Sequence, residues 1–297
     1  MGFLRKQRGI SFVRRAPTKS GEDIRIHVAK MTAPHVLWWH SHVQPIIDHD
    51  PTRADNGWNW LLYVPFAEVA GLVLTRKPAG YTIGITDPER DRFIPCALVQ
   101  LLGRVPALDD HDRESVFVWF LSTAPDEALT SIEDHPIPED RIPRRLGSIA
   151  LDVAVTHSLN HRRFGRTALY ADERGGDPLL QWYRRRGTTV LPDEEKLPPG
   201  PRRLLKPSDG RYCYYTVPAA IEVSKELPKL PVHTIEQVLR DLLVQDGAAA
   251  GREINSVYPD RAPLPSLRSS PAAPTPLLAE EWRQLLRRLA ARLKKRG

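Results

Sequence analysis

A short basic segment contains the residue types that hold phosphate groups. It reads Arg144-Arg145-Leu146-Gly147-Ser148 and stands where a strongly helical pattern begins. The first N–H groups of a helix have no partner within the helix, and the helix dipole is positive at that end, which suits a pyrophosphate. The arginines add positive charge, and Gly147 lets the backbone approach a ligand closely. The segment predicts a diphosphate site, with an ordinary helix start as the alternative.

A second polar group lacks the pattern of a metal site. Its members are His40, His42, Asp48, His49 and Asp50. Their spacing matches no histidine-based metal motif, and the chain's two cysteines, Cys96 and Cys213, are too few for a cysteine zinc site or a disulfide framework. No metal is therefore expected. The sequence also has no G-x-S-x-G, Walker or G-x-G-x-x-G loop, so nothing indicates a hydrolase, an NTPase or a dinucleotide-binding domain.

The composition is that of a globular protein with a basic excess. Of 297 residues, 41% are hydrophobic and 27% are charged, which allows a large domain with a substantial core. No apolar run is long enough to cross a bilayer, and no hydrophobic signal segment follows the basic N-terminus, so a cytoplasmic location is expected. The net charge of +7 gathers toward both ends of the chain. Such ends contact polyanions, nucleic acid included, or serve solubility alone.

Apolar patterning predicts strands that alternate with helices around the basic segment. Residues 116–121, Val-Phe-Val-Trp-Phe-Leu, are typical of a central strand covered on both faces. Residues 147–160 carry the wide apolar stripe of a helix packed on a sheet. The expected order over residues 116–191 is strand, helix, strand at 166–171, helix ending at Gly187, and strand. That order favours a parallel crossover with helices covering the sheet.

The rest of the chain is expected to add strands and two tails. Core strands are expected at residues 24–28, 60–74, 81–85, 94–102 and 210–217, with turns at Pro78, Gly80 and Asp87-Pro88. The expected division is a basic arm at 1–23, a folded domain at 24–220, a Pro/Ala-rich linker with a short helix at 221–276, and a basic amphipathic helix at 277–297. The leucine stripe of that last helix is expected to pack on the domain or on a second copy, as in a homodimer.

Residues 116–187 resemble the GCN5-related N-acetyltransferase (GNAT) family. In that family a central strand precedes a loop that reads Arg or Gln, two residues, Gly, one residue, and Gly or Ala, and this loop opens a helix. Arg144-Arg145-Leu146-Gly147-Ser148-Ile149 occupies that place here. A later helix of the family closes with an aromatic-Tyr pair and a Gly, which Trp182-Tyr183 and Gly187 match. The resemblance is weaker upstream of residue 116.

The resemblance implies an α/β (α+β) fold in which a mixed central sheet is flanked by helices and contains a splayed strand pair. It also implies N-acyl transfer, with acetyl-CoA as co-substrate held by Arg144 through Ser148 and an amine that attacks the thioester directly. The thioester carbonyl would accept a hydrogen bond from a backbone N–H near Phe120, Leu121 or Ser122. Tyr183 would protonate the departing thiolate, the alternative being that it only packs beside Trp182.

Some features depart from the family pattern. Ile149 stands in place of a small residue, where its bulk would crowd the phosphates, and Gly176 or Asp177 stands where Asn is frequent. Residues 122–143 make a long insertion. These departures leave open a GNAT-like protein that binds without catalysis and contacts nucleic acid through its basic ends.

The acceptor amine and the general base are not evident from the sequence. Glu114, directly before the central strand, and Asp109 and Asp110 are candidate bases by their position in the chain. Four tryptophans are expected either in the core or on the wall of an acceptor pocket, namely Trp38, Trp39, Trp58 and Trp60.

Overall fold

The computed structural model describes residues 12–73, 77–87, 92–132, 136–193, 195, 197 and 209–226. Its elements in chain order are β1 (Phe12–Pro17), β2 (Asp23–Lys30), α2 (Ala33–His42), α3 (Gln44–Asp48), α4 (Trp60–Val73), β3 (Lys77–Asp87), β4 (Arg92–Pro106), β5 (Glu114–Thr123), α5 (Asp126–Thr130), η1 (Glu139–Arg141), α6 (Leu146–Asn160), β6 (Thr167–Tyr170), η2 (Glu173–Gly175), α7 (Gly176–Arg184), β7 (Thr189–Val190), β8 (Tyr212–Tyr215) and α8 (Val217–Glu226). The helices expected near residue 240 and at 277–297 lie outside the described residues.

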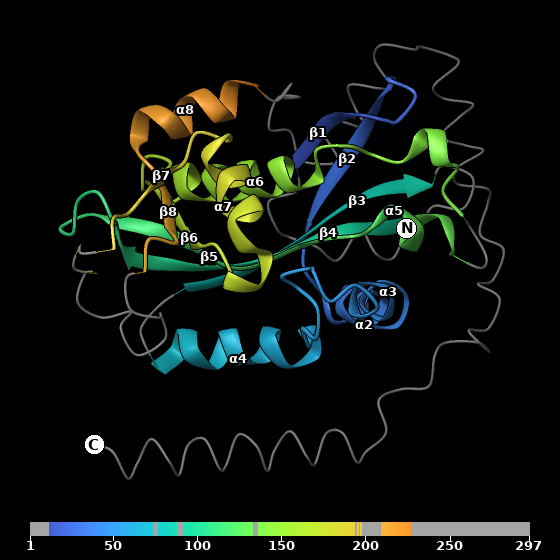
Figure 1. Cartoon of the computed structure of the whole chain (residues 1–297), viewed down its shortest axis with the longest axis horizontal. Coiled ribbons are helices and arrows are strands. Elements are labelled where there is room, and N and C mark those ends of the chain that lie inside the picture. Colours follow the sequence, from blue (N-terminus) through green and yellow to red (C-terminus); the bar gives the residue numbers. More distant parts are fainter. Residues whose placement is uncertain are drawn as a thin grey trace, which may run out of the picture. The chain divides into compact units, whose positions relative to one another are not determined.

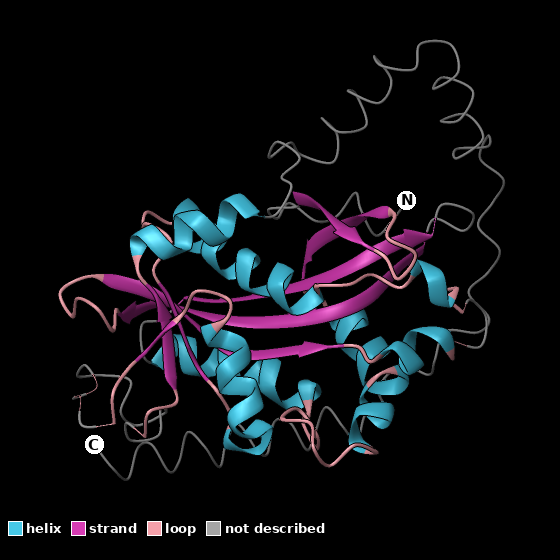
Figure 2. Cartoon of the chain, turned by 45° about the horizontal axis from the view of Figure 1, so that its top comes forward, coloured by secondary structure: helices cyan, strands magenta, loops and turns pink. Residues whose placement is uncertain are grey.

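One mixed sheet of eight strands organises the fold, in the order β1-β2-β3-β4-β5-β6-β8-β7. β1 to β5 pair antiparallel, β5 and β6 pair parallel, and β8 lies between β6 and β7, antiparallel to both. Helices cover both faces: α6 and α8 lie on one side, and α2, α3 and α4 on the other (Figures 1 and 2). The expected α/β class and the parallel β5–α6–β6 crossover are confirmed.

The parallel pair β5–β6 is short and then separates. Pairing ends at Val118 and Leu169, although β5 runs on to Thr123 beside β4. Trp119 forms a β-bulge, because Val118 and Phe120 pair with consecutive residues of β4. Past Val118, the backbone groups that β5 points toward β6 therefore have no ladder partner. The expected splayed strand pair is confirmed.

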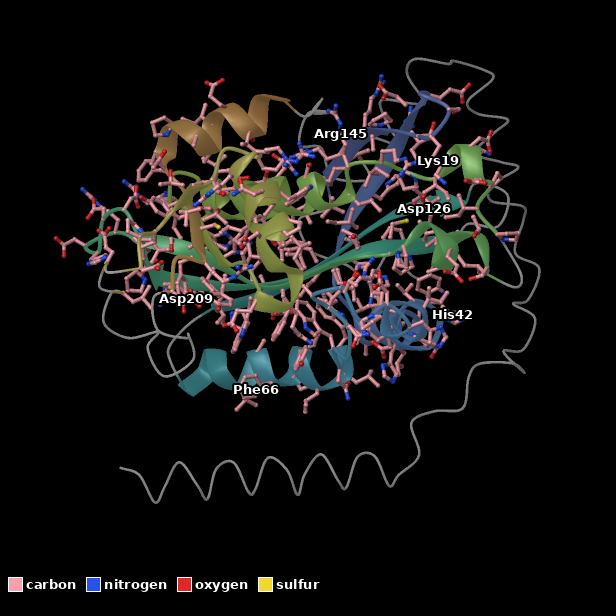
Figure 3. All side chains as sticks on the ribbon, viewed as in Figure 1. Lys19, His42, Phe66, Asp126, Arg145 and Asp209 are labelled. Carbon is pink, nitrogen blue, oxygen red and sulfur yellow. The ribbon has the colours of Figure 1, made fainter. Side chains whose placement is uncertain are left out.

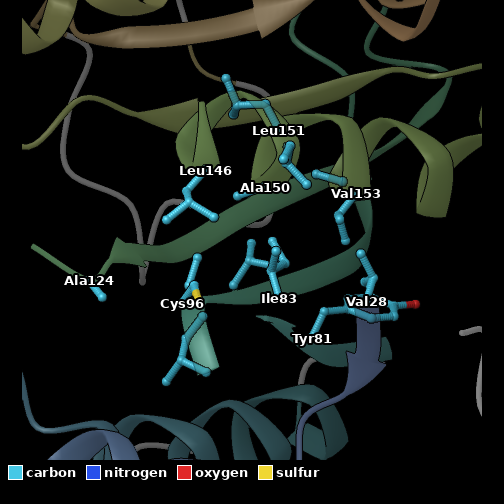
Figure 4. Packing of buried hydrophobic residues seen from close by; sticks show 14 of the residues in the cluster. Val28, Tyr81, Ile83, Cys96, Ala124, Leu146, Ala150, Leu151 and Val153 are labelled. Carbon is cyan, nitrogen blue, oxygen red and sulfur yellow. The ribbon is translucent and has the colours of Figure 1, made fainter. Parts of the chain in front are cut away.

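The main core lies between α6 and the sheet. Leu146 to Ser158 of α6 are buried apart from the half-buried Gly147, as befits a helix enclosed on nearly all sides. Figure 4 shows Leu146, Ala150 and Val153 of this helix above Ile83 and Cys96 of the sheet. This packing holds the N-terminus of α6 beside the point where β5 and β6 separate.

Residues 60–74 differ from the prediction, because residues 60–73 form the helix α4 instead of a strand. A continuous apolar run fits the repeat of a helix as well as that of a strand, so its pattern does not distinguish the two. Its length was the better signal, because this helix of 14 residues is longer than most strands. Leu61, Leu62 and Ala67 are good helix formers, and Pro65 is tolerated at the cost of one backbone hydrogen bond. α4 contacts β3 and β4 on the face opposite α6.

The prediction of an arm over residues 1–23 is wrong for residues 12–17, which form β1 and pair with β2. Arg14 made this segment look like solvated chain, yet its side chain is only 1% exposed. Its Nε donates to Asp152 Oδ2 of α6 at 2.6 Å, and its Nη2 donates to Thr156 Oγ1 at 3.2 Å. The charge is therefore compensated inside the fold by a residue far away in the sequence.

Other expected boundaries also shift. Pro78 and Gly80, where turns were expected, lie inside β3. The pairing of β2 with β3 begins only at Tyr81, so the edge of β3 at Pro78 is not paired with β2, and a proline is tolerated there. The expected linker begins too early, because residues 221–226 complete α8. β7 pairs with β8 and not with β6, so the last expected strand does not extend the parallel pair.

The buried His157 predicts acid sensitivity. Its Nδ1 lies 2.8 Å from the Tyr81 hydroxyl, and burial, with the charges of His161 and Arg163, lowers its pKa to about 3. Because this value lies below that of an unfolded histidine, the unfolded chain binds more protons between pH 6.5 and 3, and stability falls as the pH falls through that range. By pH 5 we expect this histidine to cost about 2 kcal/mol of unfolding free energy relative to pH 8.

Urea unfolding at pH 8 and pH 5 measures this cost. His157→Gln should reduce the difference between the two pH values by about 2 kcal/mol. Tyr81→Phe removes the hydrogen bond but leaves the histidine buried, so it should lower stability at both pH values by about 1 kcal/mol and keep the difference. Equal pH dependence in the parent and His157→Gln would contradict the assignment.

Candidate functional site

A cavity of about 760 Å³ lies where β5 and β6 separate. Its wall is built by residues 53–55, Trp58, Tyr63, 117–121, 143–148, 169–170, Asp172, Arg174, Leu179, Trp182, Tyr183, Arg186 and Tyr212, with Thr123, Ala124 and Asp126. These residues come from the loop before α4 and from α4 itself, from β5 and the start of α5, from the start of α6, from β6 to just past α7, and from β8. The cavity therefore joins segments far apart in the sequence.

The N-terminus of α6 forms part of this wall. Arg145 precedes the helix with a left-handed φ of 61°, and no side chain caps the helix. By helix geometry, the N–H groups of Leu146, Gly147 and Ser148 have no acceptor within the helix. The Ser148 hydroxyl is buried and has no hydrogen-bond partner among the described residues. These donors, with the positive helix end, suit a phosphate ligand.

Two arginines with no described ion-pair partner stand at this end of the cavity. Arg145 is exposed and forms no ion pair with a described residue, whereas Arg144 lies 3.6 Å from Asp126. Arg186 stacks its guanidinium over Trp182 at 5.2 Å from the ring centroid, and its buried Nε has no hydrogen-bond partner among the described residues. Arg145 and Arg186 thus supply positive charge that nothing described on the wall neutralises.

Gly147 also has a packing role, beside the one expected toward a ligand. A Cβ at this position would lie 3.0 Å from the Trp182 ring, so glycine makes room for the tryptophan. Trp182 therefore packs on the first turn of α6. Ile149 does not crowd this place, because it is fully buried in the core.

Tyr183 brings a phenol to the cavity wall. The residue is 8% exposed, and no hydrogen bond to its hydroxyl is formed by the part of the chain that the structure describes. Burial raises its pKa, and the neighbouring Cys213, Asp55 and Asp172 add to this effect. The phenol is therefore protonated at neutral pH and has a proton to give.

The structure brings most of the expected site residues together. Phe120, Leu121 and the segment 144–148 all line the cavity with Tyr183. Ser122 is buried behind the wall, where its hydroxyl donates to Asp55 Oδ2 at 2.5 Å.

The expected bases lie elsewhere. Glu114 pairs with Arg163 at 3.2 Å, Asp109 pairs with Arg166 at 3.3 Å, and Asp110 lies 3.7 Å from Arg113, all away from the cavity wall. Glu114 is the first residue of β5, whereas the cavity lies past Val118, where β5 and β6 separate. The position of a residue in the chain did not indicate its position in the site.

Sequence reasoning missed the carboxylate of Asp55, which lines the cavity. Arg53 donates to both of its oxygens at 2.8 Å, and Arg53 Nη2 also donates to the Thr123 carbonyl at 2.7 Å. This pair ties the loop before α4 to the end of β5. The only signal in the sequence was an Arg and an Asp two residues apart, which is too common to single out.

The histidine and tryptophan segment divides between core and cavity. Trp39 and Trp60 are fully buried, and Trp38 stacks on His42 with the ring centroids 5.0 Å apart. Trp58 is half-buried and lines the cavity. Among the described residues, no group of three or more His, Cys, Asp or Glu is placed to hold a metal ion. In the same part of the chain, no helix has the length and apolar character to cross a membrane.

No protein-family model matches the chain, and neither does the sequence of any curated protein. Similar solved structures include an acetyltransferase of the GNAT family from Staphylococcus aureus Mu50, which aligns with 65% of this chain and 99% of its own at 8% identity and a TM-score of 0.40. Another is the AtaT toxin with a tyrosine-to-phenylalanine substitution, bound to the C-terminus of the antitoxin AtaR and acetyl-CoA. It aligns with 67% of this chain and 97% of its own, at 12% identity and a TM-score of 0.35. These similarities concern the fold alone.

Proposed function

We propose that the cavity binds an acyl-CoA, with acetyl-CoA as the expected co-substrate, and that the protein transfers the acyl group to an amine. The observation that carries this proposal is the uncapped N-terminus of α6 in the wall of a cavity that lies where β5 and β6 separate and that Tyr183 also lines. The orphaned Ser148 hydroxyl and the N–H groups of the first turn fit a pyrophosphate. Arg145 and Arg186 fit its negative charge.

The residues of the chain have separate roles in this reaction. When bound, acetyl-CoA would supply the acetyl group: the amine nitrogen bonds to the carbonyl carbon, the carbon–sulfur bond breaks, and the sulfur receives a proton. Backbone N–H groups of β5 beyond Val118, which have no ladder partner on the β6 side, hold the carbonyl oxygen as its negative charge develops. Tyr183 donates the proton, and the proton that the amine loses passes to solvent.

Titration calorimetry with acetyl-CoA tests the binding step. Arg145→Glu places a negative charge at the α6 N-terminus and should weaken binding about 10- to 100-fold, as expected when a charge-assisted contact is lost. The effect should shrink as salt is added.

Arg162→Glu is the matched control. Arg162 is also exposed and also has a left-handed φ, of 60°, but it follows the other end of α6 and is no part of the cavity wall. It should leave the affinity for acetyl-CoA within about twofold, because screening weakens its influence over that distance. Absence of any heat with the parent protein at millimolar acetyl-CoA would sink the proposal.

The alternative, a binding protein that contacts nucleic acid through its basic ends, depends largely on residues 1–11 and 277–297, which lie outside the described part of the chain. It stays a prediction, as do the cytoplasmic location and the homodimer.

A further inference from the structure

The cavity has a second end, on the α4 side of the sheet, whose wall is aromatic. We infer that this end holds the acyl acceptor, and that the acceptor is an amine attached to an aromatic ring or a similarly flat apolar group. The inference rests on the proposed function and adds the class of acceptor to it.

The bulge in β5 directs its aromatic residues to the α4 side. Side chains alternate along a strand, so Val116 and Val118, in the core cluster with α6, face away from Phe117. The extra residue at the bulge puts Trp119 and Phe120 on the same side as Phe117. Trp119 indeed contacts Phe66 of α4, with the ring centroids 5.5 Å apart. Figure 3 shows Phe66 on the side of the sheet opposite Arg145.

The rings at this end form an ordered group. Tyr63 stacks on Phe120 at 4.3 Å and 3°, and Phe120 stacks on Trp119 at 5.6 Å and 10°. Trp58 meets Phe120 edge-on, at 5.2 Å and 80°. All four side chains are only half-buried, and all four line the cavity, so part of each ring remains open to a ligand. A flat ring can stack on such a wall or meet it edge-on.

The charges of the wall argue against acceptors with several positive charges. Each of the carboxylates among its described residues already has a cationic partner: Asp55 pairs with Arg53 at 2.8 Å, Asp126 with Lys19 at 2.9 Å and Asp172 with Arg174 at 3.2 Å. A polyamine or an aminoglycoside would find no uncompensated negative charge there. An amine beside apolar rings is favoured in its neutral form, which is the form that attacks a carbonyl.

The test compares amines and donors in the same assay of CoA release. With acetyl-CoA, tryptamine and phenethylamine should be acylated with a kcat/KM at least about tenfold above those of cadaverine and spermidine. Trp58→Ala should lower kcat/KM for tryptamine about tenfold or more, Trp58→Phe should restore most of it, and acetyl-CoA affinity by calorimetry should stay unchanged in both. Trp38→Ala, a tryptophan outside the cavity wall, is the control and should change neither quantity.

The outcomes separate this inference from the proposed function. Acetyl-CoA binding with no turnover of aromatic amines, or faster turnover of polyamines that Trp58→Ala leaves intact, overturns the inference and leaves acyl-CoA binding standing. A preference for octanoyl-CoA that is lost in Trp58→Ala also overturns it, because the rings would then hold the acyl chain. Absence of acetyl-CoA binding overturns both the proposed function and the inferred class of acceptor.

Discussion

Replacement of Tyr183 by phenylalanine is expected to lower kcat about 100- to 10,000-fold, the range in which a positioned general acid contributes. The affinity for acetyl-CoA should stay within about twofold, because the variant keeps the ring that forms the wall. Acetyl-CoA titration and the rate of CoA release, measured on the same preparation, separate the two quantities.

The environment of Tyr183 gives the physical reason. Burial and the nearby negative groups raise its pKa, so the phenol keeps its proton throughout the neutral range. No described residue forms a hydrogen bond with its hydroxyl, so the described part of the chain leaves the phenol proton available to a ligand. Loss of one oxygen atom therefore removes a proton donor and no packing.

Tyr214→Phe is the matched control for this variant. Tyr214 lies on β8, is half-buried like many wall residues, and is outside the cavity wall. Its kcat should match that of the parent. An unchanged kcat in Tyr183→Phe would assign Tyr183 to packing beside Trp182, with which its ring makes an edge contact at 5.1 Å.

Arg14→Leu is expected to lower the free energy of unfolding by about 3–5 kcal/mol, because it removes a buried guanidinium that forms an ion pair with the buried carboxylate of Asp152. Asp152 is fully buried, and its Oδ2 lies 2.6 Å from Arg14 Nε. Its other oxygen accepts a hydrogen bond from Ser224 of α8 at 3.2 Å. Urea unfolding followed by circular dichroism measures the change.

A double variant tests whether the charge of Asp152 is the cause. Arg14→Leu with Asp152→Leu removes both charges and should recover a large part of the lost stability, as apolar replacement of buried ion pairs does elsewhere. Arg113→Ala breaks a pair of exposed residues, Arg113 and Asp110 at 3.7 Å, and should cost less than about 1 kcal/mol. Equal losses in Arg14→Leu and in the double variant would show that packing, not charge, is what Arg14 contributes.

The elements around the basic segment could be predicted because their signals are local. The apolar run 116–121 indicated β5, and the wide apolar stripe of 147–160 indicated α6, within one residue of its start at Leu146. A strand, a loop and a helix in this order bring the loop to the edge of the sheet, so the segment 144–148 and Tyr183 could be expected near one another. The apolar run of α4 could not be assigned in this way, because a helix and a strand both account for it.

The composition of the site depended on contacts between residues that are distant in sequence. Asp55 belongs to the cavity because Arg53 and Ser122 hold its carboxylate, and Arg14 belongs to the core because Asp152 of α6 meets it. An ion pair with Arg163, which is also distant in sequence, holds Glu114 away from the cavity. The order of apolar and polar residues along the chain specifies which helices and strands form, because these depend on residues that are close together in the sequence. Which side chains share a cavity is decided only when the sheet register and the bulge at Trp119 bring separate elements together, and no local pattern records that.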